Sequence, residues 1–205
     1  MFGRRRLILL SILLLYVLGG LVIWLTYEAP GFTDMPTEET GVTFRNDLRE
    51  DESSNIVDYL YFYNGAGVAA GDLNGDGFLD LVFTSNQGEN KLYFNQGNWV
   101  FTDGTAASGF HKTGDWSTGV TLADVNNDGA VDIYVSQVQG ILGWEGHNAL
   151  FINDGQGHFT EEAAQRGLAI QGLCQQAAFL DADQDGDLAV DILKHSEHPR
   201  GSVAQ

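Results

Sequence analysis

The sequence is poor in the residues that rigidify a small domain. Its 205 residues include one cysteine, Cys174, and only 3 prolines. A single cysteine excludes an intrachain disulfide, so rigidity must come from packing or from bound ions. We expect Cys174 itself to be a small buried core residue.

Basic residues are scarce as well. Lys and Arg together number 10 against 28 Asp and Glu, which gives a formal net charge of −18. Because nucleic acids are bound by basic surfaces, this balance argues against a nucleic-acid partner. Concentrated carboxylates also repel one another in a compact chain, and bound cations relieve that repulsion.

The sequence lacks three common catalytic motifs. It contains no Gly-x-Ser-x-Gly nucleophile elbow, no phosphate-binding glycine-rich loop and no His-Glu-x-x-His zinc motif. His195 and His198 lie close together near the end of the chain, but no further His or Cys cluster joins them, and we interpret both as surface residues. The sequence therefore predicts a protein that is not an enzyme.

One segment is long and apolar enough to cross a bilayer. Residues 7–26 are uncharged and almost wholly apolar, and a helix of this length spans about 30 Å. Because three arginines precede it, we expect residues 1–6 to form a cytoplasmic tail, residues 7–26 a transmembrane signal anchor, and the bulk of the chain to be extracytoplasmic, in the periplasm or at the cell surface. A cleaved signal peptide, with secretion of the remainder, is the alternative.

The next segment has the composition of a connector. Residues 27–58 are polar, contain two of the prolines and show no obvious core pattern, so we interpret them as a linker or stalk. Within this linker, residues 41–44 (Gly-Val-Thr-Phe) are a candidate strand that pairs with the following region. Residues 59–205 form that region, and it is repetitive.

A nine-residue acidic loop occurs twice intact and a third time incomplete in residues 59–205. Oxygen-bearing side chains at positions 1, 3, 5 and 9, with glycine at position 6, suit Ca²⁺, which takes about 6–8 oxygen ligands. The residue at position 7 contributes its backbone carbonyl. The candidate ligands are Asp72, Asn74, Asp76, Phe78 and Asp80 in loop 1, Asp124, Asn126, Asp128, Ala130 and Asp132 in loop 2, and Asp181, Asp183, Asp185 and Asp187 in loop 3.

These loops differ from the EF-hand. An EF-hand loop lies between helices and needs a glutamate at position 12, whereas position 12 here is Phe83, Val135 or Ile192, and the flanking residues alternate as in strands. Loop 3 also departs from its own repeat, because Ala189 occupies position 9 and Asp191 lies two residues further on. We expect loop 3 to bind more weakly, or to rearrange and recruit Asp191.

The sequence around the loops repeats with them. The loops begin 52 and 57 residues apart, and the stretch 90–97 recurs as 148–155. The alternation of apolar and polar residues in each unit predicts four short strands, which is typical of a β-propeller blade. The Ala-rich stretch 161–168 is the only helical turn expected after residue 30. The expected strands are 67–71, 79–84, 91–95 and 98–102 in the first unit, 119–123, 131–136, 149–153 and 158–160 in the second, and 176–180 in the third.

These motifs resemble a known family. Residues 67–83 resemble an FG-GAP repeat, the unit of the integrin α-subunit propeller. The longer pattern, with Asn-x-Leu-Phe/Tyr-x-Asn and then Phe-Thr, is similar to the VCBS/FG-GAP repeats of bacterial surface proteins, which include a group related to cartilage acidic protein. The resemblance covers about residues 41–205. It implies an all-β fold of calcium-stabilised propeller blades used for adhesion or recognition, with the calcium ligands at the loop positions named above.

From these observations we expect a membrane-anchored calcium-binding module that recognises an unidentified protein or glycan. About two complete blades and part of a third are present, and since a propeller closes with about 4–8 blades, we expect a truncated chain, with closure by self-association as the alternative. An accessory part of a larger propeller enzyme acting on polysaccharide is the other functional reading. The tryptophans Trp99, Trp116 and Trp144 fit either a recognition surface or core packing.

Overall fold

The structure is a computed structural model, and it describes residues 31–196. The chain divides into two compact parts, Met1–Met35 and Pro36–Gln205, and the strands described below all belong to the second part. The expected cytoplasmic tail (1–6) and signal anchor (7–26) lie outside the described residues. Within residues 31–196, no helix has both the length and the apolar character that a bilayer crossing requires.

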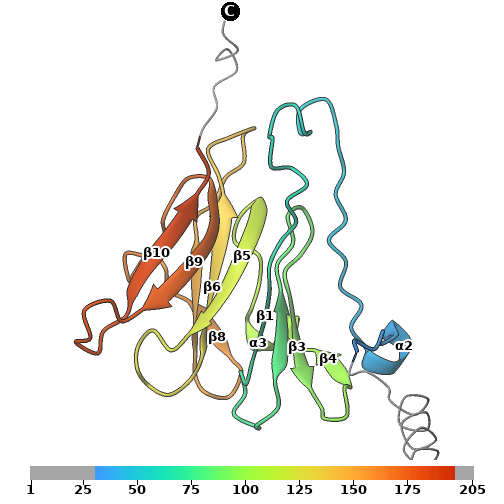
Figure 1. The fold of residues 1–205 in the computed structure, drawn as a ribbon, viewed down its shortest axis with the longest axis vertical. Helices are drawn as coiled ribbons and strands as arrows, with labels where there is room; N and C mark the ends of the chain where they lie inside the picture. The colour runs from blue at the N-terminus through green and yellow to red at the C-terminus, as the bar shows by residue number, and fades with distance from the viewer. Residues whose placement is uncertain (1–30, 197–205) are drawn as a thin grey trace, which may run out of the picture. The chain divides into compact units, whose positions relative to one another are not determined.

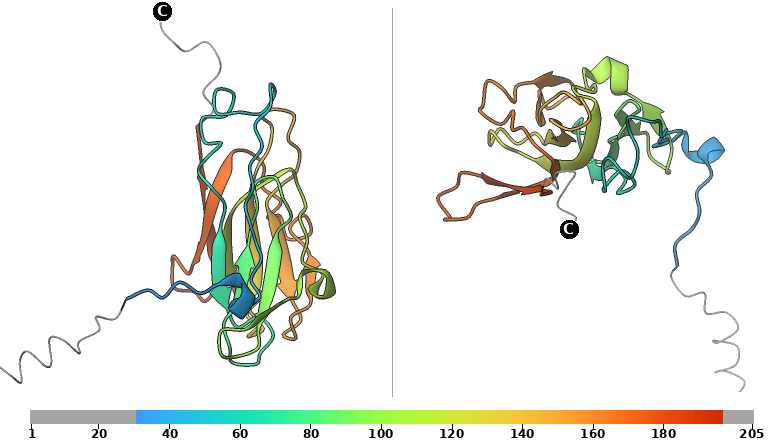
Figure 2. Two further views of the ribbon diagram at one scale, coloured as in Figure 1. Left: turned by 90° about the vertical axis from the view of Figure 1, so that its right-hand side faces the viewer. Right: turned by 90° about the horizontal axis from the view of Figure 1, so that it is seen from above.

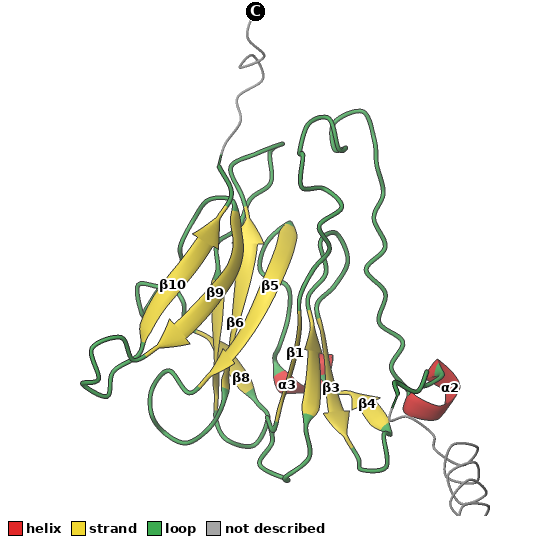
Figure 3. Ribbon diagram, in the orientation of Figure 1, coloured by secondary structure: helices red, strands yellow, loops and turns green. Residues whose placement is uncertain are grey.

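Residues 36–196 form three antiparallel sheets whose strands follow chain order (Figures 1 and 3). This arrangement confirms the all-β prediction and the four-stranded unit. Sheet A contains β1 (Val68–Gly71), β2 (Asp80–Phe83), β3 (Lys91–Asn95) and β4 (Phe101–Asp103). Sheet B contains β5 (Trp116–Ala123), β6 (Asp132–Val138), β7 (Ala149–Asn153) and β8 (Phe159–Glu161), and sheet C contains β9 (Cys174–Leu180) and β10 (Ala189–Lys194).

The expected helical turn is misplaced. The short helices are α2 (Thr37–Thr40) and α3 (Thr105–Ser108), whereas the Ala-rich stretch predicted in the second unit forms hydrogen-bonded turns. In the first unit, Thr105 anchors α3 by accepting a bond from the Leu92 amide at 3.0 Å. In the second unit, Ala163 stands at the position of Thr105 and has no hydroxyl, so the Leu150 amide is bound by the Glu161 carboxylate at 3.3 Å instead.

Sheets A and B share the largest apolar core. Their facing sides bury Leu73, Val82, Leu92, Phe110, Val120, Ile133, Val135, Ala149, Phe151 and Phe159. The first strands of the two sheets pass so closely that a Cβ on Gly67 would lie 2.6 Å from the Val120 amide nitrogen. Glycine at position 67 is therefore a packing requirement.

Side-chain hydrogen bonds to backbone carbonyls connect neighbouring sheets at their first strands, where, in the described part of the chain, no continuous ladder of backbone hydrogen bonds joins them. Thr118 Oγ1 in β5 donates to the Cys174 carbonyl in β9 at 2.8 Å, and Thr121 Oγ1 donates to the Ala177 carbonyl at 2.7 Å. On the other side, Thr84 Oγ1 donates to the Thr118 carbonyl. Cys174 is fully buried, as predicted, and burial raises the pKa of its thiol.

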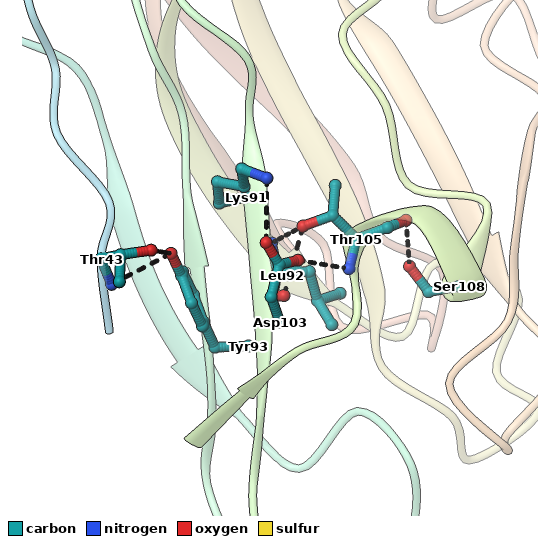
Figure 4. Close-up of polar contacts among 7 residues, drawn as sticks. All are labelled: Thr43, Lys91, Leu92, Tyr93, Asp103, Thr105 and Ser108. Atoms are coloured by element: carbon teal, nitrogen blue, oxygen red, sulfur yellow. Dashed lines mark hydrogen bonds and ion pairs between the residues drawn. The ribbon is translucent and has the colours of Figure 1, made fainter. Parts of the chain in front are cut away.

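The segment 41–49 runs along sheet A but is not a strand, so the strand expected at residues 41–44 is wrong. Thr43 contacts the Tyr93 hydroxyl through its amide at 3.3 Å and its Oγ1 at 3.2 Å (Figure 4). The Phe44 ring stacks on Phe83 with centroids 4.8 Å apart. Side-chain contacts, which need no backbone register, therefore attach this part of the expected linker to sheet A.

An aromatic cluster lies around the first residue of β5, Trp116. Trp116 is fully buried and stacks on Trp144 with centroids 4.2 Å apart, while Tyr59 packs edge-on against both rings. His195 is half-buried and stacks on Tyr61 with centroids 3.4 Å apart, a contact that the surface interpretation of this histidine did not include. His198 lies outside the described residues.

Lys112 gives a prediction for the pH dependence of stability. Its ammonium donates to the Asn86 and Gly88 carbonyls at 2.8 and 2.9 Å, and burial lowers its pKa to about 8 despite nearby Glu89 and Asp115. The unfolded chain holds this proton up to its ordinary pKa of 10.5, so the free energy of unfolding should rise with pH between about 8 and 10.5.

The comparison of Lys112→Met with the wild type isolates this effect, because other titrating groups cancel in the difference. Urea unfolding at several pH values from 7 to 10.5 should show a wild-type gain that the variant lacks. Parallel pH profiles for the two proteins would contradict the prediction.

Candidate metal centre

The three acidic loops occupy the same place in their sheets. Each joins the first strand to the second: loop 1 joins β1 to β2, loop 2 joins β5 to β6, and loop 3 joins β9 to β10. All three lie towards the lower side of Figure 1, and the two further views show the same sheets from the side and from above (Figure 2). The fold therefore gathers the predicted ligands at one end of the strands.

In loop 1 the aspartate at position 1 holds the backbone of the turn. Asp72 Oδ1 accepts from the amides of Gly75 and Asp76 at 2.8 and 3.1 Å, and Oδ2 accepts from the Gly77 amide at 2.9 Å. At position 3, Asn74 Oδ1 accepts from the Asp76 amide at 3.1 Å. These bonds aim the oxygens of positions 1 and 3 towards the interior of the loop.

Loop 2 repeats these hydrogen bonds at the same positions. Asp124 accepts from the amides of Asp128 and Gly129 at 3.1 and 2.8 Å. Asn126 Oδ1 accepts from the Asp128 amide at 3.1 Å, and its Nδ2 donates to Asp128 Oδ2 at 2.7 Å. The recurrence shows that the local sequence determines the loop conformation.

The backbone explains the glycine at position 6. Positions 4 and 6 both have a positive φ in all three loops, a conformation that glycine adopts without steric cost. The angles are 75° and 86° for Gly75 and Gly77, 58° and 89° for Asn127 and Gly129, and 64° and 96° for Gln184 and Gly186. Position 4 tolerates Asn and Gln, and position 6 is glycine in every copy.

The aspartate at position 9 is buried, and its carboxylate accepts hydrogen bonds from the loop and from the third strand of the sheet. We call this pair of hydrogen bonds the clip. Asp80 accepts from the Leu73 amide at 2.9 Å and from the Asn95 amide at 2.8 Å, so it ties the loop to β3. Asp132 makes the equivalent bonds in sheet B. Burial, assisted by the nearby loop aspartates, raises the pKa of Asp80 despite the two amides.

The loop acids are not among the carboxylates that form ion pairs within residues 31–196. The four ion pairs found among residues 31–196 involve Asp47, Asp103, Asp154 and Glu162, and none of these is a loop ligand. A buried carboxylate whose neighbours are other carboxylates favours binding of a cation. The donor set of carboxylate, amide and backbone carbonyl oxygens fits Ca²⁺ in loops 1 and 2.

Loop 3 brings together three carboxylates without the clip. Ligand oxygens of Asp181, Asp183 and Asp185 all lie within 4.8 Å of one another, on exposed side chains. Ala189 at position 9 cannot accept the two amide bonds, and Asp191 pairs with Ala178 within the ladder and is not part of the trio. The fourth candidate, Asp187, donates its amide to Asp185 Oδ1 at 2.9 Å.

The structure adds residues that the sequence reasoning left without a role. Asn95 and Asn153 end the third strands, and each donates its amide to the position-9 aspartate of its own sheet at 2.8 Å. Asn90 and Asn148 immediately precede these strands, and their side-chain oxygens accept from the amides of Ser85 and Gln137 at 3.0 and 2.8 Å. The only signal for these roles was the recurrence of both asparagines in the motif Asn-x-Leu-Phe/Tyr-x-Asn.

Successive loops flank two cavities. A cavity of about 440 Å³ lies between loop 1, loop 2 and the β7–β8 hairpin, and its lining includes Asp72, Asp128 and Asn153. A second, of about 360 Å³, lies between loops 2 and 3 and is lined in part by Asp124 and Asp187. Neighbouring loops are therefore close enough to influence one another.

The four-stranded units with an acidic loop after the first strand define a class of repeat protein. Residues 72–135 match the FG-GAP-like repeat family, so the chain contains a repeat of this family. This match spans loop 1, the rest of sheet A and loop 2, and it confirms the resemblance drawn from the sequence.

The curated relatives share one name. Cartilage acidic protein 1 of Mus musculus is 34% identical over 88 residues (43% of this chain, 13% of the relative), and that of Homo sapiens is 31% identical over 91 residues (44% and 13%). Cartilage acidic protein 1 of Xenopus tropicalis is 28% identical over 132 residues (63% and 19%). The chain spans less than one fifth of the length of these relatives.

Proposed function

We propose that this protein is an extracytoplasmic calcium-binding recognition module built of FG-GAP-type propeller blades. The observation that carries the proposal is the recurrence of one loop conformation at the same corner of successive sheets, in which the position-1 aspartate accepts from the amide of position 5. Sheets A and B are two blades in this proposal, and sheet C is the first half of a third.

The ligands in this proposal are the loop residues predicted from the sequence. Loops 1 and 2 would each hold one Ca²⁺ through the side chains of positions 1, 3, 5 and 9 and the carbonyl of position 7. Loop 3 would hold one through Asp181, Asp183, Asp185 and the Asp187 carbonyl. The ion supplies positive charge that offsets carboxylate repulsion and fixes the turn, which replaces the disulfides that the sequence cannot form.

A calcium titration tests the metal sites. Isothermal titration calorimetry of the full chain, in a mild detergent, should show two sites of similar affinity and a weaker third, because loop 3 lacks the position-9 aspartate. Extracellular modules bind calcium with Kd values of about 10⁻⁴–10⁻³ M, so the titration should reach about 10 mM. Asp76→Ala and Asp128→Ala should each abolish one of the two stronger sites.

Asp47→Ala is the matched control for these variants. It removes the same charge from an exposed residue of segment 41–49 that pairs with Arg45 and lies outside the loops. The control should bind like the wild type. Unchanged heats in both loop variants, or no binding at 10 mM, would contradict the metal proposal.

Recognition of a protein or glycan is the function we assign to the surface beside loop 1. Phe78 and Trp99 are 49% and 69% exposed, and the Phe78 ring lies against Gly97 of the hairpin that carries Trp99. Trp99 has a φ of 64° because it occupies the tight turn of this hairpin, which holds its side chain at the tip. Exposed aromatic residues on loops are typical binding anchors.

The location and the absence of catalysis belong to the same proposal. The apolar segment 7–26 supports a membrane anchor with the repeats outside the cytoplasm, where calcium is abundant enough to fill weak sites. Recognition is favoured over catalysis because the spaced acids of residues 59–196 are accounted for mainly by the loops. Turnover of any polysaccharide by this chain would favour the alternative of a propeller enzyme.

A further inference from the structure

Asn153 is the residue that touches two candidate metal loops. Its Nδ2 donates to the Leu73 carbonyl of loop 1 at 2.8 Å and to the Val131 carbonyl of loop 2 at 2.9 Å. Its backbone amide donates to Asp132 Oδ1 at 2.8 Å. The side chain is 2% exposed, so water does not compete for these bonds.

The hairpin after Asn153 is seated on loop 1. A Cβ on Gly157 would lie 3.2 Å from Asn74 Cβ, and a Cβ on Gly75 would lie 3.4 Å from the Gly155 carbonyl oxygen. Gly157 has a φ of 80°, so a larger residue there would be strained as well as crowded. Loop 1 therefore rests on an element of sheet B whose start is held by loop 2.

Asn95 is the equivalent residue of sheet A and shows what the second contact adds. Its amide donates to Asp80 Oδ1 at 2.8 Å, and its Nδ2 donates to the Leu79 carbonyl at 2.9 Å, both within the first unit. Within residues 31–196, the hydrogen bonds of Asn95 stay inside sheet A and its loops. The two asparagines thus share the clip within the sheet, and Asn153 adds the bond to the neighbouring loop.

We propose that Asn153 couples calcium binding at loops 1 and 2, so that an ion in one loop raises the affinity of the other. An ion in loop 2 orders residues 131–132, which fixes the Asn153 amide group. The fixed amide group then holds the Leu73 carbonyl, so loop 1 loses less conformational freedom when it binds. Linkage makes the effect equal in both directions. The inference rests on the proposed calcium sites.

A double-mutant cycle tests the coupling on the full chain. Asp185→Ala is present throughout to remove loop 3, and the Gly77 and Gly129 amide resonances report calcium binding at loops 1 and 2. In this background, Asp128→Ala should weaken calcium binding at loop 1 by about fivefold or more, the lower range of typical couplings. Asp76→Ala should weaken loop 2 by the same factor.

Asn153→Ala should remove this dependence. In the Asn153→Ala protein, the affinity of loop 1 should be the same with and without Asp128→Ala. Asn95→Ala is the matched control: it should lower the affinity of loop 1 but leave the fivefold coupling in place. If Asn153→Ala does not fold, Asn153→Ser, which is too short to bridge the two carbonyls, takes its place in the cycle.

The outcomes separate the two proposals. No calcium response at Gly77 or Gly129 overturns the metal sites and the coupling with them. Calcium binding at both loops with no change on Asp128→Ala overturns the coupling alone. Coupling that survives Asn153→Ala, or disappears in Asn95→Ala as well, overturns the role of Asn153.

Discussion

Chelation of calcium should lower the midpoint of thermal unfolding by about 10 °C or more. At 10 mM calcium, a site with a Kd of about 10⁻⁴ M holds its ion at 100 times its Kd, which adds about 2.7 kcal/mol to the free energy of unfolding if the ion binds only the folded state, so two such sites add about 5 kcal/mol. For a chain of this size, 1 kcal/mol corresponds to about 2–4 °C. Relief of repulsion in a chain with a net charge of −18 acts in the same direction.

The measurement is a pair of calorimetric scans of the full chain, one in 10 mM calcium and one in excess chelator. Sodium chloride at equal ionic strength in the chelator sample controls for simple screening of the acids. The triple variant Asp76→Ala, Asp128→Ala, Asp185→Ala should melt at one temperature in both solutions. Equal midpoints for the wild type would refute a stabilising role of the loops.

Loss of the clip at position 9 should be the most damaging single change in the loops. Asp132→Ala removes a fully buried carboxylate and leaves the amides of Val125 and Asn153, bound at 3.0 and 2.8 Å, without their acceptor. An unsatisfied buried amide costs about 1–3 kcal/mol, and release of the buried charge offsets part of the two losses. We expect a decrease of about 3 kcal/mol in the free energy of unfolding.

Urea unfolding in excess chelator measures this effect, because ions then contribute nothing to the difference. Asp187→Ala is the control, since this aspartate is exposed and its amide, not its carboxylate, makes the bond to Asp185. The control should stay within about 0.5 kcal/mol of the wild type. If Asp132→Ala also changed the free energy of unfolding by no more than about 0.5 kcal/mol, the carboxylate would have no structural role as the clip.

Local sequence was sufficient to predict the loops and most strands. The ligand spacing, the glycine at position 6 and the alternation after each loop are short-range signals, and the structure places strands β3 and β7 at the predicted bounds. The same signals located the Ca²⁺ ligand candidates, which the structure groups by loop. The repeat made these predictions firmer, because each copy supports the others.

Contacts between distant residues were beyond the sequence pattern. The clip by Asp80, the Asn153 bridge and the stack of His195 on Tyr61 each join segments that only the folded chain brings together. The same holds for segment 41–49, whose polar composition indicates a linker but whose Phe44 packs on sheet A. Trp116 is buried and Trp99 is exposed, an outcome that depends on contacts with distant segments, which the local sequence pattern does not predict.

Sheet B has a neighbour on either side, since β5 contacts β1 of sheet A and β9 of sheet C. The sheets should therefore open locally in an order set by their number of neighbours. Sheet C can detach while the core between sheets A and B stays intact, so its amides should exchange with deuterium first. Opening of residues 116–161 would release both flanking sheets at once, which makes the middle unit the centre of cooperativity for residues 36–196.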